Sequence, residues 1–302
     1  MELDPSFSIV IPTYNRPERL KQCLQSLARL DYPRDRFEVV VVDDGSRMSL
    51  APVTQPFETQ LPLRLIRQDN AGPANARNTG AAAAKGHYLV FTDDDCQPTV
   101  NWLTALAEAL HGFPNALIGG HTINALPDNL YSTTSQLLID YIYTYYNQTK
   151  GEPTFFASNN FAVPRIQYQE LGGFDTSFPL AAGEDREFCD RWLHHGLPMH
   201  YAPDMRIYHS HTLTLKSFWR QHFNYGRGAF CFHQVRAKRN AQPIQVEPFS
   251  FYINLLTYPL KQPSSQPGLL VSGLMFLSQI ANVVGFAQGK GEHRRQAELV
   301  KP

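Results

Sequence analysis

Several features of secreted and disulfide-bonded proteins are missing from this sequence. It has only four cysteines, and these lie far apart, with no Cys-x-x-Cys pair and no zinc-binding spacing with histidine: Cys23, Cys96, Cys189 and Cys231. The first five residues, Met1 to Pro5, have neither the basic stretch nor the apolar stretch of a signal peptide. Together these absences lead us to expect a cytoplasmic protein with reduced thiols.

The sequence also lacks an excess of charge of either sign. Its 27 lysine and arginine residues are balanced by 27 aspartate and glutamate residues. Proteins that wrap nucleic acid usually carry a basic excess, so we expect no nucleic-acid partner. Neither a Gly-x-Gly-x-x-Gly fingerprint nor a Walker A loop occurs, so binding of nicotinamide dinucleotides and P-loop chemistry have no support.

What the sequence does have is the composition and alternation of a large α/β domain. Hydrophobic residues make up 43% of its 302 residues, which is typical of a folded globular protein. Short apolar runs are predicted strands at 7–12, 37–42, 63–68 and 87–92. Helices are predicted between them, near 20–27 and 74–85. This alternation predicts a Rossmann-like, mostly parallel sheet flanked by helices.

The rest of the chain divides less clearly. Further helices are predicted at 102–110, 131–146 and 184–195, and prolines interrupt a less regular tail beyond Gly228. We therefore expect one domain over 1–240, with a first half of about 1–100 and a second of about 101–240. A C-terminal helical extension over 241–302 follows, with an apolar helix at 269–288.

Acidic residues follow two of the predicted strands, at the edge of the sheet where ligands bind in such folds. Asp93 and Asp95 form an Asp-x-Asp pair, and carboxylates of this kind hold Mg²⁺ or Mn²⁺ against a diphosphate. Asp43 or Asp44 could accept hydrogen bonds from a ribose or a base. Both pairs could equally belong to solvated turns or helix caps.

Two segments carry arginines that could face an anion. Arg77 lies in a segment, 70–80, whose backbone N–H groups lead into a helix and could hold an anionic or polar nucleotide group. Arg220 and Arg227 lie among aromatic residues, where a diphosphate or an acceptor could bind. The structural alternatives are simple capping around a solvated Arg77 and an amphipathic helix with solvated arginines.

Two further groups could take part in chemistry. Glu184 and Asp185 begin a predicted helix after a loop at 178–183, and Asp185 could be a general base. The helix dipole explains acidic residues there without any catalytic role, and we expect the dipole and Arg186 to keep Asp185 ionised. His209 and His211 alternate after a predicted strand and so could face one site. His209 is a candidate third metal ligand, with a structural histidine as the alternative.

Six short blocks, in their order along the chain, resemble the family 2 glycosyltransferases, which have the GT-A fold. The resemblance covers roughly 6–230, and its blocks are Phe7–Arg16, Val42–Ser46, Ala76–Gly80, Phe91–Asp95, Gly172–Asp175 and Gly183–Asp185. It implies a donor-binding first half and an acceptor and catalytic second half. It also implies inverting transfer from a nucleoside diphosphate sugar, with UDP as the favoured nucleotide and Mn²⁺ or Mg²⁺ as cofactor.

The resemblance also implies roles for individual residues. Asp185 would be the catalytic base, while Asp93 and Asp95 would hold the cation and His209 would complete its site. The residues implied to bind the nucleotide are Pro12, Thr13, Asp43 or Asp44, Arg77 and Asp93. Those implied on the acceptor side are Asn159, Asn160, Glu184 and Arg227.

The acceptor would be a hydroxyl of a glycan or lipid-linked molecule, in glycan, glycolipid or cell-surface polysaccharide synthesis. The segment 219–228 lacks the Gln-x-x-Arg-Trp block of processive synthases, which favours addition of one or a few sugars. Two other functions stay open: a catalytically silent module that binds sugar nucleotides, and a nucleotidyltransferase. The latter would be expected to show a glycine-rich, basic loop near its N-terminus, where this chain has Pro12–Arg16.

The apolar helix at 269–288 is long enough to span a bilayer, which takes about 20 residues. Its polar residues Ser272, Gln279 and Asn282 fall on one helical face, which indicates an amphipathic helix. Peripheral membrane contact, spanning, and packing on the catalytic domain all stay open. Contact would place this cytoplasmic protein at the inner face of the plasma membrane.

Overall fold

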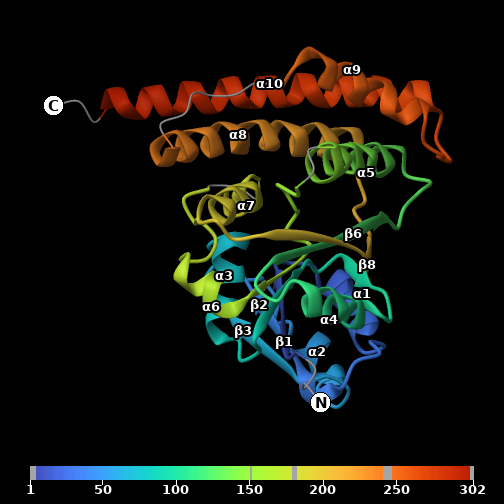
Figure 1. The fold of residues 1–302 in the computed structure, drawn as a ribbon, viewed down its shortest axis with the longest axis vertical. Helices are drawn as coiled ribbons and strands as arrows, with labels where there is room; N and C mark the ends of the chain where they lie inside the picture. Colours follow the sequence, from blue (N-terminus) through green and yellow to red (C-terminus); the bar gives the residue numbers. More distant parts are fainter. Residues whose placement is uncertain (1–4, 150–151, 179–181, 241–246, 300–302) are drawn as a thin grey trace.

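The computed structural model describes residues 5–149, 152–178, 182–240 and 247–299. An α/β domain, which contains the first four strands, lies below a layer of helices formed by later parts of the chain (Figure 1). Residues 179–181 of the predicted loop before Asp185, and 241–246 at the predicted domain boundary, lie outside the described residues.

The first half of the chain forms the parallel part of the sheet. Its strands are β1 (Phe7–Thr13), β2 (Phe37–Asp43), β3 (Leu63–Arg67) and β4 (Tyr88–Thr92), joined in the order β3-β2-β1-β4. Ile9 and Val39 face one hydrophobic core and Val10 another, because successive side chains of a strand point to opposite faces. Both faces are therefore covered, as the β-branched runs predict.

Helices follow the strands as expected. Helix α1 (Pro17–Leu27) has proline in its first turn, where no hydrogen bond is lost, and buries Leu20 and Leu24. Helix α3 (Pro73–Ala83) begins in the same way after Gly72. Three short helical segments complete this half: η1 (Arg34–Arg36), α2 (Ala51–Thr54) and η2 (Gln55–Phe57).

The second half of the chain adds four strands to the same sheet: β5 (Cys96–Pro98), β6 (Leu117–Asn124), β7 (Asn160–Pro164) and β8 (Met199–His209). The full order is β3-β2-β1-β4-β7-β6-β8-β5. Strand β7 is antiparallel to both β4 and β6, and β5 is antiparallel to β8. The prediction of a mostly parallel sheet thus describes the first half, whereas the whole sheet is mixed.

The described residues of this half form five α-helices: α4 (Trp102–Gly112), α5 (Leu130–Tyr143), α6 (Arg165–Glu170), α7 (Glu184–His194) and α8 (Leu215–Asn240). Helix α5 continues as a π-helix, η3 (Thr144–Thr149). Together, α5 and η3 span the predicted helix at 131–146. The predicted helices at 102–110 and 184–195 correspond to α4 and α7.

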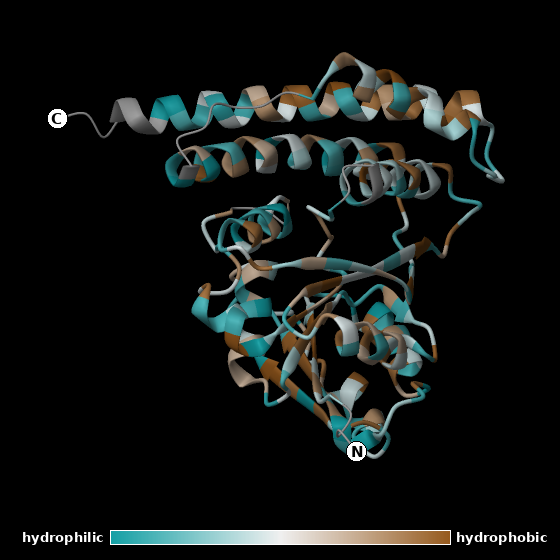
Figure 2. Ribbon diagram, viewed as in Figure 1, coloured by the Kyte–Doolittle hydropathy of each residue, from teal (hydrophilic) through white to brown (hydrophobic). Residues whose placement is uncertain are grey.

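The C-terminal helices pack on the rest of the molecule. They are α9 (Phe249–Thr257), the short η4 (Tyr258–Leu260) and α10 (Gly268–Leu299), and α10 lies alongside α8 (Figure 1). Residues of α5, α9 and α10 share one hydrophobic core: Leu138, Tyr141, Phe251, Leu255, Val271 and Met275. Among the described residues, α10 is the one helix long and apolar enough to cross a membrane, over 268–295. Apolar residues gather in its first half, and its second half is polar (Figure 2).

Candidate functional site

A large cleft of about 1720 Å³ separates the carboxyl ends of the first strands from the helical layer. One part of its wall comes from the ends of β1 and β4, a second from the start of α7 and the end of β8, and a third from α5, α9 and α10. Most of the residues predicted to carry chemistry line this cleft.

The end of β1 and the loops beside it form the predicted nucleotide site. Pro12, Thr13 and Asp44 line the cleft. The carboxylate of Asp44 accepts hydrogen bonds from the backbone N–H groups of Ala71 and Gly72, both at 2.9 Å. Asp43 is buried, and its carboxylate accepts a hydrogen bond from the N–H of Ser46 at 2.8 Å. In the described structure, then, Asp44 is the one of the two that faces the cleft.

The three consecutive aspartates after β4 have three different sets of partners. Asp93 pairs with Arg77 at 2.7 Å. Asp94 accepts a hydrogen bond from the hydroxyl of Thr13 at 2.7 Å and pairs with Arg16 at 3.1 Å. Asp95 pairs with Arg19 at 2.8 Å and with His209 at 3.3 Å. Residues Asp94, Arg16 and Arg19 were not predicted from the sequence.

Burial acts differently on two of these aspartates. It raises the pKa of Asp94 to about 6, because the nearby Arg16 only partly offsets the loss of solvent. Burial would also raise the pKa of Asp95, but the hydrogen bond and charge of His209, together with Arg16, hold it well below its usual range. Asp95 is therefore an ionised carboxylate at neutral pH.

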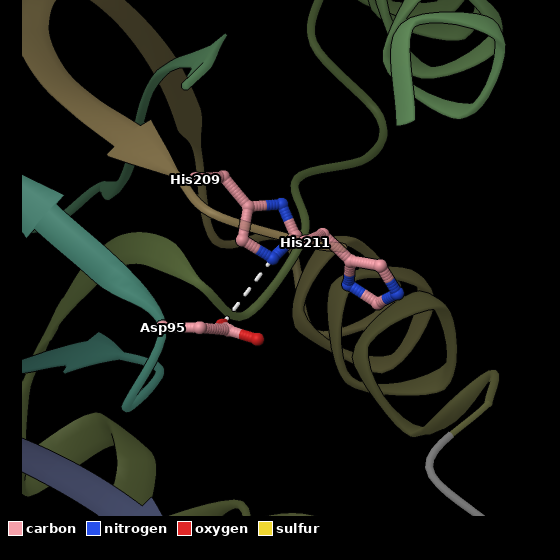
Figure 3. Close-up of side chains that lie close together, drawn as sticks. All are labelled: Asp95, His209 and His211. Atoms are coloured by element: carbon pink, nitrogen blue, oxygen red, sulfur yellow. Dashed lines mark ion pairs between the residues drawn. The ribbon is translucent and has the colours of Figure 1, made fainter. Parts of the chain in front are cut away.

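Asp95, His209 and His211 form a candidate cation site (Figure 3). One ligand atom from each lies within 4.8 Å of the others. The strand pairing explains this, because β5 is antiparallel to β8 with Cys96 opposite His209. Burial and the neighbouring His209 lower the pKa of His211 to about 4, which leaves its imidazole neutral and able to bind a metal. Asp93, the other predicted ligand, is not a member of this group.

His209 pairs with Asp95 while its imidazole is protonated; once it is unprotonated, the carboxylate and the two imidazoles are donors that suit a divalent cation such as Mn²⁺. Mg²⁺ strongly prefers oxygen ligands, whereas Mn²⁺ accepts both carboxylate oxygen and imidazole nitrogen. The residues present therefore fit the predicted divalent cation.

The predicted catalytic base lies at the start of α7. Gly183 precedes the helix with φ 93°, a left-handed conformation that glycine adopts without strain. The side chain of Asp185 lines the cleft and accepts a hydrogen bond from the N–H of Arg186 at 2.8 Å. Burial raises the pKa of Asp185, against the lowering effect of its backbone hydrogen bonds and Arg77. The hydrogen bond from the N–H of Arg186 favours the ionised carboxylate, as expected, whereas burial opposes ionisation; that Asp185 is ionised at neutral pH stays a prediction.

Arg77 connects the two acidic groups. Its side chain is 5% exposed, and its guanidinium pairs with Asp93 at 2.7 Å and with Glu184 at 3.2 Å. Burial would lower the pKa of Arg77, but these carboxylates raise it, so the guanidinium is permanently charged. Burial and the neighbouring Asp185 raise the pKa of Glu184. Arg77 therefore fixes the start of α7 against the end of β4.

The predicted acceptor-side residues divide into two groups. Asn159 and Glu184 line the cleft. The side chain of Asn160 is instead fully buried, where it bonds to the indole of Trp102 at 2.9 Å and to the carbonyl of Met205 at 2.9 Å. Asn160 was predicted to contact the acceptor. The structure corrects this to a structural role, because none of its side-chain polar atoms is free for a ligand.

Arg227 is a second correction. It lies on the face of α8 that packs against α10, and it pairs with Glu292 at 2.7 Å. It holds two helices together and, in the described structure, takes no part in the wall of the cleft.

Comparison with known proteins identifies a family and several relatives of this chain. The family model described as glycosyl transferase family 2 matches residues 8–172. Glycosyltransferase AglE of Haloferax volcanii is 27% identical over 204 residues, which cover 67% of this chain and 66% of that protein. Validoxylamine A glucosyltransferase of Streptomyces hygroscopicus subsp. jinggangensis is 29% identical over 223 residues, which cover 65% of this chain and 53% of that protein. The chain thus matches about half to two thirds of the length of these relatives.

Solved structures share the fold at lower identity. A mannosyltransferase from Pyrobaculum calidifontis, in complex with GDP-Man and Mn²⁺, has a TM-score of 0.61 and 21% identity over 96% of this chain and 81% of that one. Residues 1–349 of TarS from Staphylococcus aureus, in complex with UDP-GlcNAc, have a TM-score of 0.54 and 17% identity. The match covers 96% of this chain and 92% of that one. The predicted fold, with its C-terminal helix, is confirmed.

Proposed function

The chain belongs to glycosyl transferase family 2, and we propose that it is an inverting glycosyltransferase that moves a sugar from a nucleoside diphosphate sugar to an acceptor hydroxyl. The observation that carries this proposal is that the candidate cation site and Asp185 line the same cleft. Transfer needs one acidic group to hold the cation that stabilises the departing diphosphate. It needs another to accept the proton of the acceptor hydroxyl, and the two groups are separate here.

Asp185 is the proposed base. As the acceptor oxygen bonds to the anomeric carbon of the sugar, the bond from that carbon to the diphosphate breaks, and the hydroxyl proton passes to the Asp185 carboxylate. Attack on the face opposite the leaving group inverts the anomeric configuration. Arg77 supports this geometry because it ties Glu184, the neighbour of Asp185, to Asp93 beside the donor.

Asp95, His209 and His211 are proposed to hold the divalent cation. When bound, the cation supplies a Lewis acid that stabilises the charge developing on the diphosphate. Pro12, Thr13 and Asp44 line the same part of the cleft and are proposed to bind the nucleotide, with Asp93 beside its diphosphate. UDP is the favoured nucleotide, while the solved neighbours bind GDP-Man and UDP-GlcNAc.

We also propose that the protein contacts the inner face of the plasma membrane peripherally. Helix α10 has the length and hydropathy of a spanning helix, but it packs lengthwise on α8. Its exposed apolar residues include Leu269, Phe276 and Val283, spaced seven residues apart on one face. Such a face suits a helix that lies in the membrane surface, and spanning would strip α10 from α8.

A donor screen tests the proposed function. Thermal unfolding would be followed with Mn²⁺ and each of UDP-Glc, UDP-GlcNAc, UDP-Gal and GDP-Man. A donor at 100 times its dissociation constant stabilises the folded state by about 2.7 kcal/mol, and we expect this for one of them. Asp95→Ala should lose the Mn²⁺-dependent part of the shift. If no nucleotide sugar raises the melting temperature of the wild-type protein, the proposal is wrong.

A further inference from the structure

One arm of the cleft is lined by aliphatic side chains, which the charged diphosphate and the hydroxylated sugar of a donor do not need. Its lining comes from three helices: Leu138 and Ile142 of α5, Leu255 of α9, and Ile280 and Val283 of α10. The cleft as a whole, about 1720 Å³, is larger than the roughly 300–1,000 Å³ of a typical small-molecule site. There is room for a second, largely apolar ligand beside the donor.

A cation lies where this apolar arm meets the reaction centre. Arg186 follows Asp185 directly and lines the cleft, with its guanidinium 4.6 Å over the ring of Phe232. It makes no ion pair with any described residue, whereas the nearby Arg236 pairs with Asp190 at 3.2 Å. A guanidinium held in place on an aromatic ring and left without a carboxylate can bind an anionic group.

The acidic groups around Arg186 are already engaged. Asp190 pairs with arginines of α8, and Glu247 accepts hydrogen bonds from the hydroxyls of Tyr145 and Tyr146 at 2.8 and 2.7 Å. Asp185 is held by the N–H of Arg186 and serves as the proposed base. Among the described residues, Arg186 is therefore the cation at this junction that is available to a ligand.

We propose that the acceptor is a lipid-linked glycosyl phosphate. Its sugar hydroxyl faces Asp185, its phosphate binds Arg186, and its hydrocarbon chain lies along the apolar arm between α5, α9 and α10. This rests on the proposed function and specifies the acceptor of the same site. The same bonds form and break as in that reaction: the proton goes to Asp185, and the lipid phosphate stays intact.

The apolar arm opens at the surface that we propose to face the membrane. Phe276, Ile280 and Val283 both line the cleft and are exposed, by 56%, 40% and 69%. A lipid chain could therefore enter from the bilayer without its hydrocarbon crossing water. This continuity favours a membrane-borne acceptor over a soluble glycan.

Matched acceptors test the inference. Glucose, galactose and N-acetylglucosamine would each be offered as the methyl phosphate diester, the octyl phosphate diester and the neutral octyl glycoside, with the donor from the screen and Mn²⁺. For the head group that is used, kcat/KM of the octyl phosphate acceptor should exceed that of the methyl form by at least about tenfold, since the longer chain is buried. The kcat/KM of the octyl phosphate acceptor should exceed that of the neutral octyl glycoside by a similar factor.

Variants separate the two contacts. Ile280→Ser combined with Val283→Ser should reduce the octyl-to-methyl ratio to near one. Arg186→Gln should remove the preference for phosphate over the neutral octyl glycoside. Val100→Ser, at an exposed apolar residue outside the cleft, is the matched control and should leave both ratios unchanged.

Calorimetric binding of octyl phosphate, against octanol, gives a readout that needs no turnover. We expect octyl phosphate to bind more tightly than octanol, and Arg186→Gln to abolish the difference. Equal use of methyl and octyl acceptors, or equal binding of octyl phosphate and octanol, would overturn the lipid acceptor while leaving sugar transfer intact. Failure of the proposed function is distinct, because it would show as the absence of any donor-induced thermal shift.

Discussion

Asp185 and Glu184 are adjacent in sequence but lie in different surroundings. Glu184 is buried and paired with Arg77, so its charge is used within the protein. Asp185 lines the cleft and is held by a backbone N–H group, with no described ion pair to a cation. This difference supports the proposed base role of Asp185 and favours a positioning role for Glu184.

The first prediction follows from that assignment. Asp185→Asn should lower kcat by at least about 100-fold, the lower range for loss of a general base, and leave donor binding unchanged. Glu184→Gln keeps hydrogen-bonding atoms towards Arg77 and should cost less. Steady-state kinetics with the acceptor from the matched panel, and donor binding by thermal shift, provide the measurement. Near-normal turnover by purified Asp185→Asn would show that another group accepts the proton.

The second prediction concerns pH. Because burial raises the pKa of Asp185, its carboxylate gains a proton at a higher pH than an ordinary aspartate, whose pKa is about 3.9. The protonated form cannot accept the acceptor proton, so kcat/KM should fall as the pH is lowered through this raised pKa. The acidic limb should be missing from the residual activity of Asp185→Asn. An identical limb in the variant would assign it to a different group.

Only part of the site could be predicted from the sequence, because the face on which a side chain lies is decided in three dimensions. The motif placed Asp95 and His209 in one site, and pairing of β5 with β8 brings them together. Asn159 and Asn160 look equivalent in sequence, yet successive residues entering a strand point to opposite sides. The partners Arg16 and Arg19 depend on how α1 lies against the strand ends, which no local pattern encodes.

Helices α8 and α10 pack along one another in the layer above the cleft. A methyl group at Gly226 would overlap the carbonyl of Asn282, and one at Gly285 would overlap the carbonyl of Phe223. Two backbones that approach this closely need glycine at the crossing. Arg227 and Glu292 add an ion pair at 2.7 Å further along the same pair.

This packing leads to a third prediction. Gly285→Ala should destabilise the protein by about 1–3 kcal/mol, as expected for an added methyl group in a filled interface. Gly273 lies in the same helix, and a methyl group added there would have no other atom within 4 Å, so Gly273→Ala is the matched control. It should be neutral or stabilise by up to about 1 kcal/mol, since alanine favours helix more than glycine. Denaturant unfolding would compare them, and equal effects would contradict the close crossing.

Helix α8 was not predicted as one long helix. Gly226 and Gly228 lower the helix propensity of this segment. A larger side chain at Gly226 would overlap Asn282 of α10, and one at Gly228 would overlap Ala182, so the packing needs glycine at both positions. The strands of the first half, by contrast, were predicted to within a residue or so, since their buried β-branched runs carry a local signal.

At the scale of the whole molecule, the helical layer joins the reaction cleft to an exposed apolar face. The α/β domain holds the acidic groups, and α5, α9 and α10 supply the apolar wall. The two parts share the cleft, and the cleft opens at the face that we propose to contact the membrane. Membrane contact would therefore place the reaction site beside the bilayer. The C-terminal segment, predicted as an extension, is thus one wall of the proposed active site.

The fourth prediction tests how α10 meets the membrane. Wild-type protein should float with liposomes and be released by alkaline carbonate, as a peripheral protein is. Leu269→Asp should weaken binding at least about tenfold, because Leu269 is 80% exposed on the apolar face. Val100→Asp, on the catalytic domain, should have no effect. Retention after carbonate would show that α10 spans the bilayer, and equal binding by both variants would remove this face as the contact.

The central claim is that this cleft transfers a sugar with inversion and needs a divalent cation. Proton NMR of the product, formed from an α-linked nucleotide sugar with Mn²⁺ and after its removal by EDTA, tests both parts at once. We predict a β-linked product with Mn²⁺, almost none after chelation, and recovery when Mn²⁺ is restored. An α-linked product, or full product formation in EDTA, would contradict the account.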